Sequence, residues 1–191
     1  GRLRARIETA YPDAGTVKVV VEEAPRDPIT LRLRVPAWAT GATVTGPAGS
    51  AVAAPGWCED ARVLEPGDAY VLELGDDPRI VWPDPRIDAV RCTVAIERGP
   101  LVMCLESTDL PAGLRLEDIR LDTGRAPAAS GDGALVSASL MPRPAAVPGS
   151  PPYAATRPEH ASDASFDVTL VPYHRWGERQ PSEMRVFLPV R

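Results

Sequence analysis

The chain has 191 residues, of which 44% are hydrophobic and 25% are charged, a balance typical of globular proteins. Its formal net charge of −5 provides no basic surface for nucleic acid or anionic lipid. No apolar run approaches the roughly 20 residues that span a bilayer, so we expect neither a nucleic-acid nor a membrane partner. The 22 prolines and 15 glycines favour many short strands joined by turns over long helices.

Apolar and polar residues alternate from the beginning of the chain, as in strands with one wet face and one buried face. In the first segment Leu3, Ala5 and Ile7 alternate with charged residues, so we expect this apolar face to be buried. Turn residues at 11–15 follow, and a second alternating segment at 17–21 completes a predicted hairpin. Further strands are predicted at residues 31–35, around residue 44 and at residues 70–74.

The second half of the chain continues this pattern, with predicted strands at residues 92–96, 101–105, 166–170 and 184–188. The run from Leu101 to Leu105 is apolar on both faces, so it is either fully covered or part of a contact. Residues 114–121 are the best helical stretch, and they are too few for a stable helix.

One segment, from about 122 to 165, is rich in Pro, Ala, Gly and Ser. Its only plausible strand lies at 135–140. We predict a long, loose excursion of the chain over this segment.

Together these patterns predict an all-β protein built as an antiparallel β-sandwich or a jelly-roll-like fold. The prolines of the sequence Trp82-Pro83-Asp84-Pro85 cannot extend a central strand, and they favour a stiff joint at this point. We therefore predict two packed sandwich modules, over residues 1–82 and 83–191, with the excursion in the second.

The three cysteines are odd in number and include no CxxC pair, so they support neither a disulfide framework nor a zinc-binding pattern. We interpret Cys58, Cys92 and Cys104 as reduced, buried thiols, which behave as small hydrophobic side chains. Reduced thiols are typical of a cytoplasmic protein.

Several side chains invite a catalytic interpretation. Paired carboxylates are one general arrangement for catalysis, and in glycoside hydrolysis they lie about 5–5.5 Å apart for retention or about 6.5–9.5 Å apart for inversion. Glu97, Glu106 and Asp109 are the best candidates because they cluster around Gly99-Pro100, but Glu97 is expected to face solvent on its strand. Neither of the two histidines has a nearby partner for nucleophilic catalysis; they are His160 and His174.

Carbohydrate binding is another function to consider besides catalysis, because sugar rings stack on exposed aromatic side chains. Tryptophan is buried on average, so we favour core or interface positions for these rings. The four tryptophans are Trp38, Trp57, Trp82 and Trp176. The block Arg98-Gly99-Pro100 is expected to be structural, with Gly99 and Pro100 forming a bend and Arg98 bridging it to a carboxylate or to backbone carbonyls.

Several sequence blocks, in one order, connect the chain with a known family. They are Tyr11-Pro12 with Gly15, the segment 31–38 ending in an RxPxW pattern, Gly56-Trp57 with Arg62 and Gly67-Asp68, the segment 94–106 with Arg98-Gly99-Pro100, Cys104 and Glu106, and the segment 171–184 with Trp176, Arg179 and Met184. The chain resembles the C-terminal portion of glycoside hydrolase family 127, the bacterial β-L-arabinofuranosidase family.

This resemblance implies that an (α/α)6 barrel precedes the region, and that the barrel carries a catalytic glutamate and a cysteine nucleophile in a zinc-bound cysteine cluster. None of those residues is identified in this chain, so we assign it no catalytic, cofactor-binding or metal-binding residue, and zinc is expected in the missing domain only. The prediction is a non-catalytic accessory region of a bacterial, cytoplasmic glycoside hydrolase. Its expected partner is the catalytic barrel, with a homodimer and a weak carbohydrate contact left open.

Overall fold

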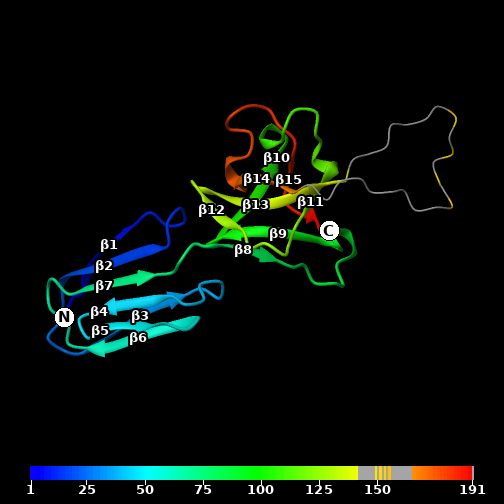
Figure 1. Ribbon diagram of the computed structural model, residues 1–191. Coiled ribbons are helices and arrows are strands. Elements are labelled where there is room, and N and C mark those ends of the chain that lie inside the picture. The colour runs from blue at the N-terminus through cyan, green and yellow to red at the C-terminus, as the bar shows by residue number, and fades with distance from the viewer. Residues whose placement is uncertain (142–148, 150, 152, 154, 156–164, 191) are drawn as a thin grey trace. The chain divides into compact units, whose positions relative to one another are not determined.

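The computed structural model describes residues 1–141, 149, 151, 153, 155 and 165–190 (Figure 1). These residues form short strands in antiparallel sheets, together with four 3₁₀ turns of three residues each, which confirms the predicted all-β class. None of the helices in the described ranges has the length and hydropathy of a membrane span. The chain divides into two compact units, residues 1–77 with 99–101, and residues 78–98 with 102–191.

The first unit contains a five-stranded sheet and a two-stranded sheet, drawn in blue to cyan in Figure 1. The larger sheet has the order β1-β2-β7-β4-β5, and β3 pairs with β6 over seven residues. The bounds are β1 (Arg4–Thr9), β2 (Thr16–Glu23), β3 (Ile29–Val35), β4 (Thr43–Gly46), β5 (Gly49–Val52), β6 (Gly56–Arg62) and β7 (Ala69–Glu73).

The β3–β6 pair covers part of one face of the larger sheet, and this gives the unit its core. Val19, Val21 and Tyr70 are buried, and the half-buried Leu31 and Leu33 of β3 pack against them. These residues recur at every second position, because successive side chains of a strand point to opposite faces. Burial of each Val or Leu side chain contributes about 1.5–3 kcal/mol to stability.

Strand β1 departs from the prediction in one respect. Ile7 lies opposite Val19 and Ala5 lies opposite Val21 in the antiparallel register, so they share the face of the sheet that forms the core. Yet Ile7 is 65% exposed, Leu3 is 44% exposed, and Ala5 is exposed as well. The predicted burial of this face is therefore wrong for β1 as the chain stands, because the two-stranded layer that covers β2 does not cover the edge strand.

The second unit is built on one long sheet, drawn in green to red in Figure 1. Its order is β11-β13-β14-β10-β9-β16, with β12 paired to β13, β15 to β10 and β8 to β9. The bounds are β8 (Pro78–Val81), β9 (Thr93–Arg98), β10 (Leu101–Glu106), β11 (Ile119–Leu121), β12 (Ala128–Ser130), β13 (Gly133–Leu140), β14 (Ser165–Pro172), β15 (Met184–Arg185) and β16 (Leu188–Pro189).

Strand β9 has two strands in succession along one edge. Strand β8 pairs with residues 95–98 of β9, whereas β16 pairs with residues 93–94. The other edge of β9 is occupied by β10. The middle of the sheet is buried: Met103, Cys104 and Leu105 of β10 are 0% exposed, so the apolar run at 101–105 is largely covered.

Two predicted boundaries differ from the structure. The joint predicted at residues 82–85 lies a few residues beyond the division at 77/78, because β8 pairs with β9 and belongs to the second unit. The excursion predicted at about 122–165 includes β12 and β13, and β13 pairs with both β11 and β14 inside the sheet. Most of residues 142–164 lie outside the described residues.

Candidate functional site

The best-defined polar cluster of the second unit surrounds Glu106, the last residue of β10. This side chain is 1% exposed. Its Oε1 accepts hydrogen bonds from the backbone N–H of Gly177 at 2.8 Å and from the Ser182 hydroxyl at 2.7 Å. Its Oε2 forms an ion pair with Arg179. A buried carboxylate with this many donors is compensated for its loss of hydration.

Arg179 connects Glu106 to a second carboxylate. Its Nη1 donates to Oδ1 of Asp109 at 2.7 Å, and its Nη2 donates to Oδ2 of the same residue at 2.6 Å. This is a bidentate pair, the strongest geometry available between arginine and a carboxylate. The hydrogen bonds to Asp109 and then to Glu106 raise the pKa of Arg179, so the cluster contains a permanent positive charge.

These contacts decide the chemistry available to Glu106. Burial alone raises the pKa of this carboxyl, but the hydrogen bonds from Ser182, Arg179 and Gly177 together outweigh it and hold the pKa below the usual range. The general acid of a glycosidase needs a raised pKa, because it must hold the proton that it donates to the leaving group. Glu106 is suited instead to anchoring the 173–183 segment onto β10.

The other two carboxylate candidates lie in different contacts. Asp109 is linked to Glu106 through Arg179, whereas Glu97 is not part of this cluster. Glu97 on β9 is paired with Arg79 on β8. Arg179, which bonds to Glu106 as well as to Asp109, helps to keep Glu106 ionised, whereas a glycosidase pair requires one acid and one base.

The three cysteines lie in different surroundings. Cys104 is buried, and burial, followed by the charges of Glu106 and Asp109, raises the pKa of its thiol to about 11. Cys58 is half-buried and packs against the first core, whereas Cys92 is exposed, so the predicted burial of Cys92 is wrong. A buried neutral thiol does not provide the thiolate that zinc requires.

The same types of side chain are potential metal ligands. Within the described part of the chain, no group of three or more His, Cys, Asp or Glu side chains is arranged to hold a metal ion. The described residues therefore do not fit a zinc cluster of the kind that the resemblance implies for the barrel. His174 is exposed in the 3₁₀ turn η4 (Tyr173–Arg175), and His160 lies outside the described residues.

The tryptophans are more exposed than predicted. Trp38 is half-buried and packs against the core of the first unit. The other three are surface residues of this chain, with exposed fractions of 62% for Trp57, 60% for Trp82 and 46% for Trp176. A core position is therefore wrong for these three, while an interface position stays a prediction. Three exposed rings keep the carbohydrate-binding alternative open.

The bend at Arg98-Gly99-Pro100 has the predicted structural contacts. Arg98 Nη1 donates to the carbonyl of Gly131 at 2.6 Å and to that of Gly133 at 3.0 Å. This confirms that Arg98 bridges the bend to backbone carbonyls. Gly99 has φ +52°, a left-handed conformation that favours glycine.

Gly99→Ala is expected to destabilise the chain by about 1–2 kcal/mol, because L-residues pay this cost in the left-handed region. A Cβ at this position meets no atom nearer than 3.6 Å, so crowding adds little. Thermal unfolding measures the effect, and Gly99→Asn serves as the matched control, since asparagine tolerates this conformation better. Equal losses for Ala and Asn would point to a cause other than backbone strain.

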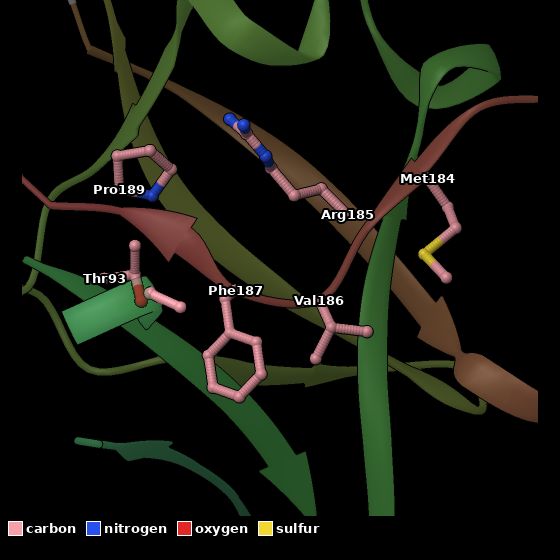
Figure 2. Close-up of a pocket in the computed structure, with 7 residues that line it drawn as sticks. Thr93, Met184, Arg185, Val186, Phe187 and Pro189 are labelled. Atoms are coloured by element: carbon pink, nitrogen blue, oxygen red, sulfur yellow. The ribbon is translucent and has the colours of Figure 1, made fainter. Parts of the chain in front are cut away.

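A pocket of about 380 Å³ lies between the start of β9 and the 184–189 segment (Figure 2). The side chains of Val186 and Phe187 extend to one side of this segment and that of Arg185 to the other. Thr93 and Pro189 complete much of the lining. The lining holds no carboxylate, imidazole or thiol, so it provides no general acid, base or nucleophile.

Sequence reasoning did not identify the central contact of the cluster, which is Glu106 with Arg179. The two residues are 73 positions apart, and no local pattern links them. The family resemblance contained a usable signal. Glu106 lies in one of the matching sequence blocks and Arg179 in another, and an acidic residue in one block with a basic residue in the other suggests an ion pair.

Comparison with known proteins places the whole described fold in one family. The model of the GH127 middle domain of β-L-arabinofuranosidase matches residues 1–75, and that of the glycoside hydrolase family 127 C-terminal domain matches residues 78–189. A non-reducing end β-L-arabinofuranosidase from Bifidobacterium longum subsp. longum is 31% identical, over 93% of this chain and 29% of the relative.

Solved structures agree with this assignment. A GH127 β-L-arabinofuranosidase from Geobacillus stearothermophilus T6 superposes with a TM-score of 0.81 at 25% identity, over 99% of this chain and 31% of that one. A second structure, described as a glycoside hydrolase, has a TM-score of 0.80 at 26% identity, over 100% of this chain and 32% of that one. The chain thus spans about a third of the length of these relatives. On this evidence the chain belongs to glycoside hydrolase family 127, of which it carries the middle and C-terminal domains.

Proposed function

We propose that this chain is the non-catalytic accessory region of a β-L-arabinofuranosidase-like glycoside hydrolase, and that it docks onto a catalytic (α/α)6 barrel outside the chain. The observation that carries the proposal is the uncovered apolar face of β1. Ile7 presents 65% of its surface to solvent on the face that forms the core elsewhere in the sheet, and Leu3, which immediately precedes the strand, presents 44%. A sheet face of this kind is stable when another layer covers it.

The opposite face of the same strands supports a one-sided contact. It carries an ion-pair ladder in which Arg4 and Arg6 lie 3.1 Å and 3.6 Å from Glu22, and Lys18 lies 3.4 Å from Glu8. This charged face is suited to solvent, whereas the face that carries Ile7 is suited to a partner. The absence of a fitting acid and base around Glu106 supports an accessory role for the chain itself.

The test is an experiment on a longer polypeptide that contains the barrel and this chain, with a protease site engineered at their junction. After cleavage, the two pieces should co-elute on gel filtration, and Ile7→Asp should separate them. Lys18→Asp, on the charged face, is the matched control and should leave them together. Zinc and hydrolysis of an aryl β-L-arabinofuranoside should be found in the barrel piece alone.

Hydrolysis by the purified chain, abolished by Glu97→Gln or Glu106→Gln, would contradict the non-catalytic part. Elution as separate pieces, with Ile7 intact, would contradict docking. A concentration-dependent dimer of the isolated chain that Ile7→Asp dissociates would show that a second copy covers this face instead.

A further inference from the structure

A second pocket of about 220 Å³ lies in the second unit beside the turn that follows β14. Strand β14 contributes Thr169, the turn between β12 and β13 contributes Asp132, and the 172–179 segment contributes Arg175, Glu178 and Arg179. The polar atoms of this pocket therefore come from three separate parts of the chain. A small concave site with converging polar groups is the usual form of a ligand site.

The charges of the pocket are balanced. Arg175 forms an ion pair with Asp132, and its Nε donates to Oε2 of Glu178 at 2.9 Å. Arg179, which also lines the pocket, forms ion pairs with Glu106 and Asp109. Two guanidinium groups and two carboxylates thus line the pocket, with donors and acceptors side by side. A neutral ligand with several hydroxyl groups matches this arrangement better than a phosphate or a cation does.

The same segment carries two exposed aromatic rings, Tyr173 and Trp176, which alternate in sequence with the residues that line the pocket. The backbone N–H of Trp176 donates to the carbonyl of Tyr173 at 3.1 Å, and that of Glu178 donates to the carbonyl of Arg175 at 3.2 Å. The first of these bonds closes the 3₁₀ turn η4, so Tyr173 and Trp176, which are three positions apart, lie on the same side. The second closes a turn through Gly177, which has φ +76°. Tyr173 and Trp176 have 48% and 46% of their surfaces exposed.

The indole ring of Trp176 is held in place before any ligand arrives. Trp176 Nε1 donates to the carbonyl of Ser182 at 3.0 Å, which fixes the indole. The next residue, Gly177, donates its N–H to the buried carboxylate of Glu106 at 2.8 Å. Preorganisation of this kind lowers the entropy cost of binding.

We propose that this pocket and the Tyr173–Trp176 pair form a carbohydrate-binding site for a neutral pentose or hexose chain. One sugar residue occupies the pocket, where its hydroxyls bond to the side chains of Asp132, Thr169, Arg175 and Glu178. The adjoining residue stacks its C–H face on the aromatic pair. The site shares no residue with the docking face of β1, so the sugar-binding proposal and the docking proposal can be tested independently.

The experiment is a titration of the ¹⁵N-labelled 191-residue chain with L-arabinose, D-glucose and xylotriose, followed by NMR. We expect saturable shifts of the Trp176 indole N–H and of backbone amides at 132 and 169–179. Affinity should be higher for the trisaccharide than for the monosaccharides. Trp176→Ala and Arg175→Ala should each weaken binding by about tenfold, the effect of losing one stacked ring or one charged hydrogen bond.

Two controls make the result specific. Trp82→Ala removes a ring of similar exposure that is not part of the pocket, and it should leave the affinity unchanged. Thr169→Val removes only a pocket hydroxyl and leaves the turn intact, so it should weaken binding even if Arg175→Ala disturbs the fold. Three outcomes would overturn the proposal. The first is that none of the three sugars gives saturable shifts, and the second is that Trp176→Ala and Thr169→Val bind sugar as tightly as the parent chain does. The third is that inorganic phosphate displaces the sugar.

Discussion

Gly133→Ala should remove about 3–5 kcal/mol from the stability of the second unit, a loss large enough to prevent it from folding cooperatively. A Cβ built on Gly133 lies 2.0 Å from the carbonyl oxygen of Leu170, which is a backbone atom of the neighbouring strand. Relief of this overlap requires β13 and β14 to separate where Ala134 pairs with Leu170. The carbonyl of Gly133, which accepts a hydrogen bond from Arg98, would move as well.

Gly131→Ala is the matched control for this change. Gly131 has φ +56° but no atom within 4 Å of an added Cβ, so it should lose only the 1–2 kcal/mol of left-handed strain. Chemical denaturation followed by tryptophan fluorescence and circular dichroism measures both variants. Similar losses for Gly131→Ala and Gly133→Ala would show that the close approach to Leu170 is not what requires glycine at 133.

The strand that contains Gly133 also shows where sequence reasoning was limited. Val136 and Leu140 indicate a strand, but the surrounding Gly, Ala and Ser residues resemble a loop in composition. In the structure Ala134, Ala138, Ser137 and Ser139 are buried in the sheet, where small side chains allow close packing. Composition therefore predicted a loose excursion where the structure has strand β13, because small residues that pack closely in a sheet have the same composition as a loop.

The first strand illustrates a different limit. Alternation correctly predicted a strand with Ala5 and Ile7 on one face, because the period of a strand is local, whereas Leu3 lies before Arg4, the first residue of β1. Whether that face is covered depends on a second layer, and the β3–β6 layer covers β2 but leaves β1 open. Period-two patterns predict which residues share a face, and only tertiary structure decides burial.

The second large effect is expected from Glu106→Ala, which should cost about 2–4 kcal/mol at pH 7. The change removes the acceptor of the Gly177 N–H and the Ser182 hydroxyl and breaks one of the two ion pairs of Arg179. Arg179 keeps Asp109 as a partner, which limits the loss. Glu178→Gln, in a pair whose side chains are 48% and 54% exposed, is the control and should change stability little.

Acid should erase the difference between the parent chain and Glu106→Gln. Because the folded protein holds the pKa of Glu106 below its usual value, the unfolded chain binds the proton more readily. The stability that the carboxylate contributes is therefore complete above the ordinary glutamate pKa of about 4.3 and declines as the pH falls below it. Denaturation at pH 7 and at about pH 3 checks the sign, and a difference that grows in acid would contradict this role.

The Glu106 cluster could be predicted only in part. The resemblance identified the blocks that contain Glu106 and Arg179, and the bend at Gly99 was predicted with its arginine contacts. The distance in sequence between β10 and the 177–182 segment hid their contact, because neither periodicity nor spacing relates residues so far apart. Asp109 was weighed as a catalytic partner, whereas the arginine between the two carboxylates makes it part of an anchor.

The two strands that share one edge of β9 have a consequence for the order of folding. Residues 1–77 can complete the five-stranded sheet and its cover with contacts inside that stretch, so the first unit can fold while later residues are still being synthesised. The edge of β9, by contrast, is complete only when Leu188 and Pro189 pair with Val94 and Thr93. Contacts between such distant positions carry a high loop-closure entropy, so the second unit should close late and more slowly than the first.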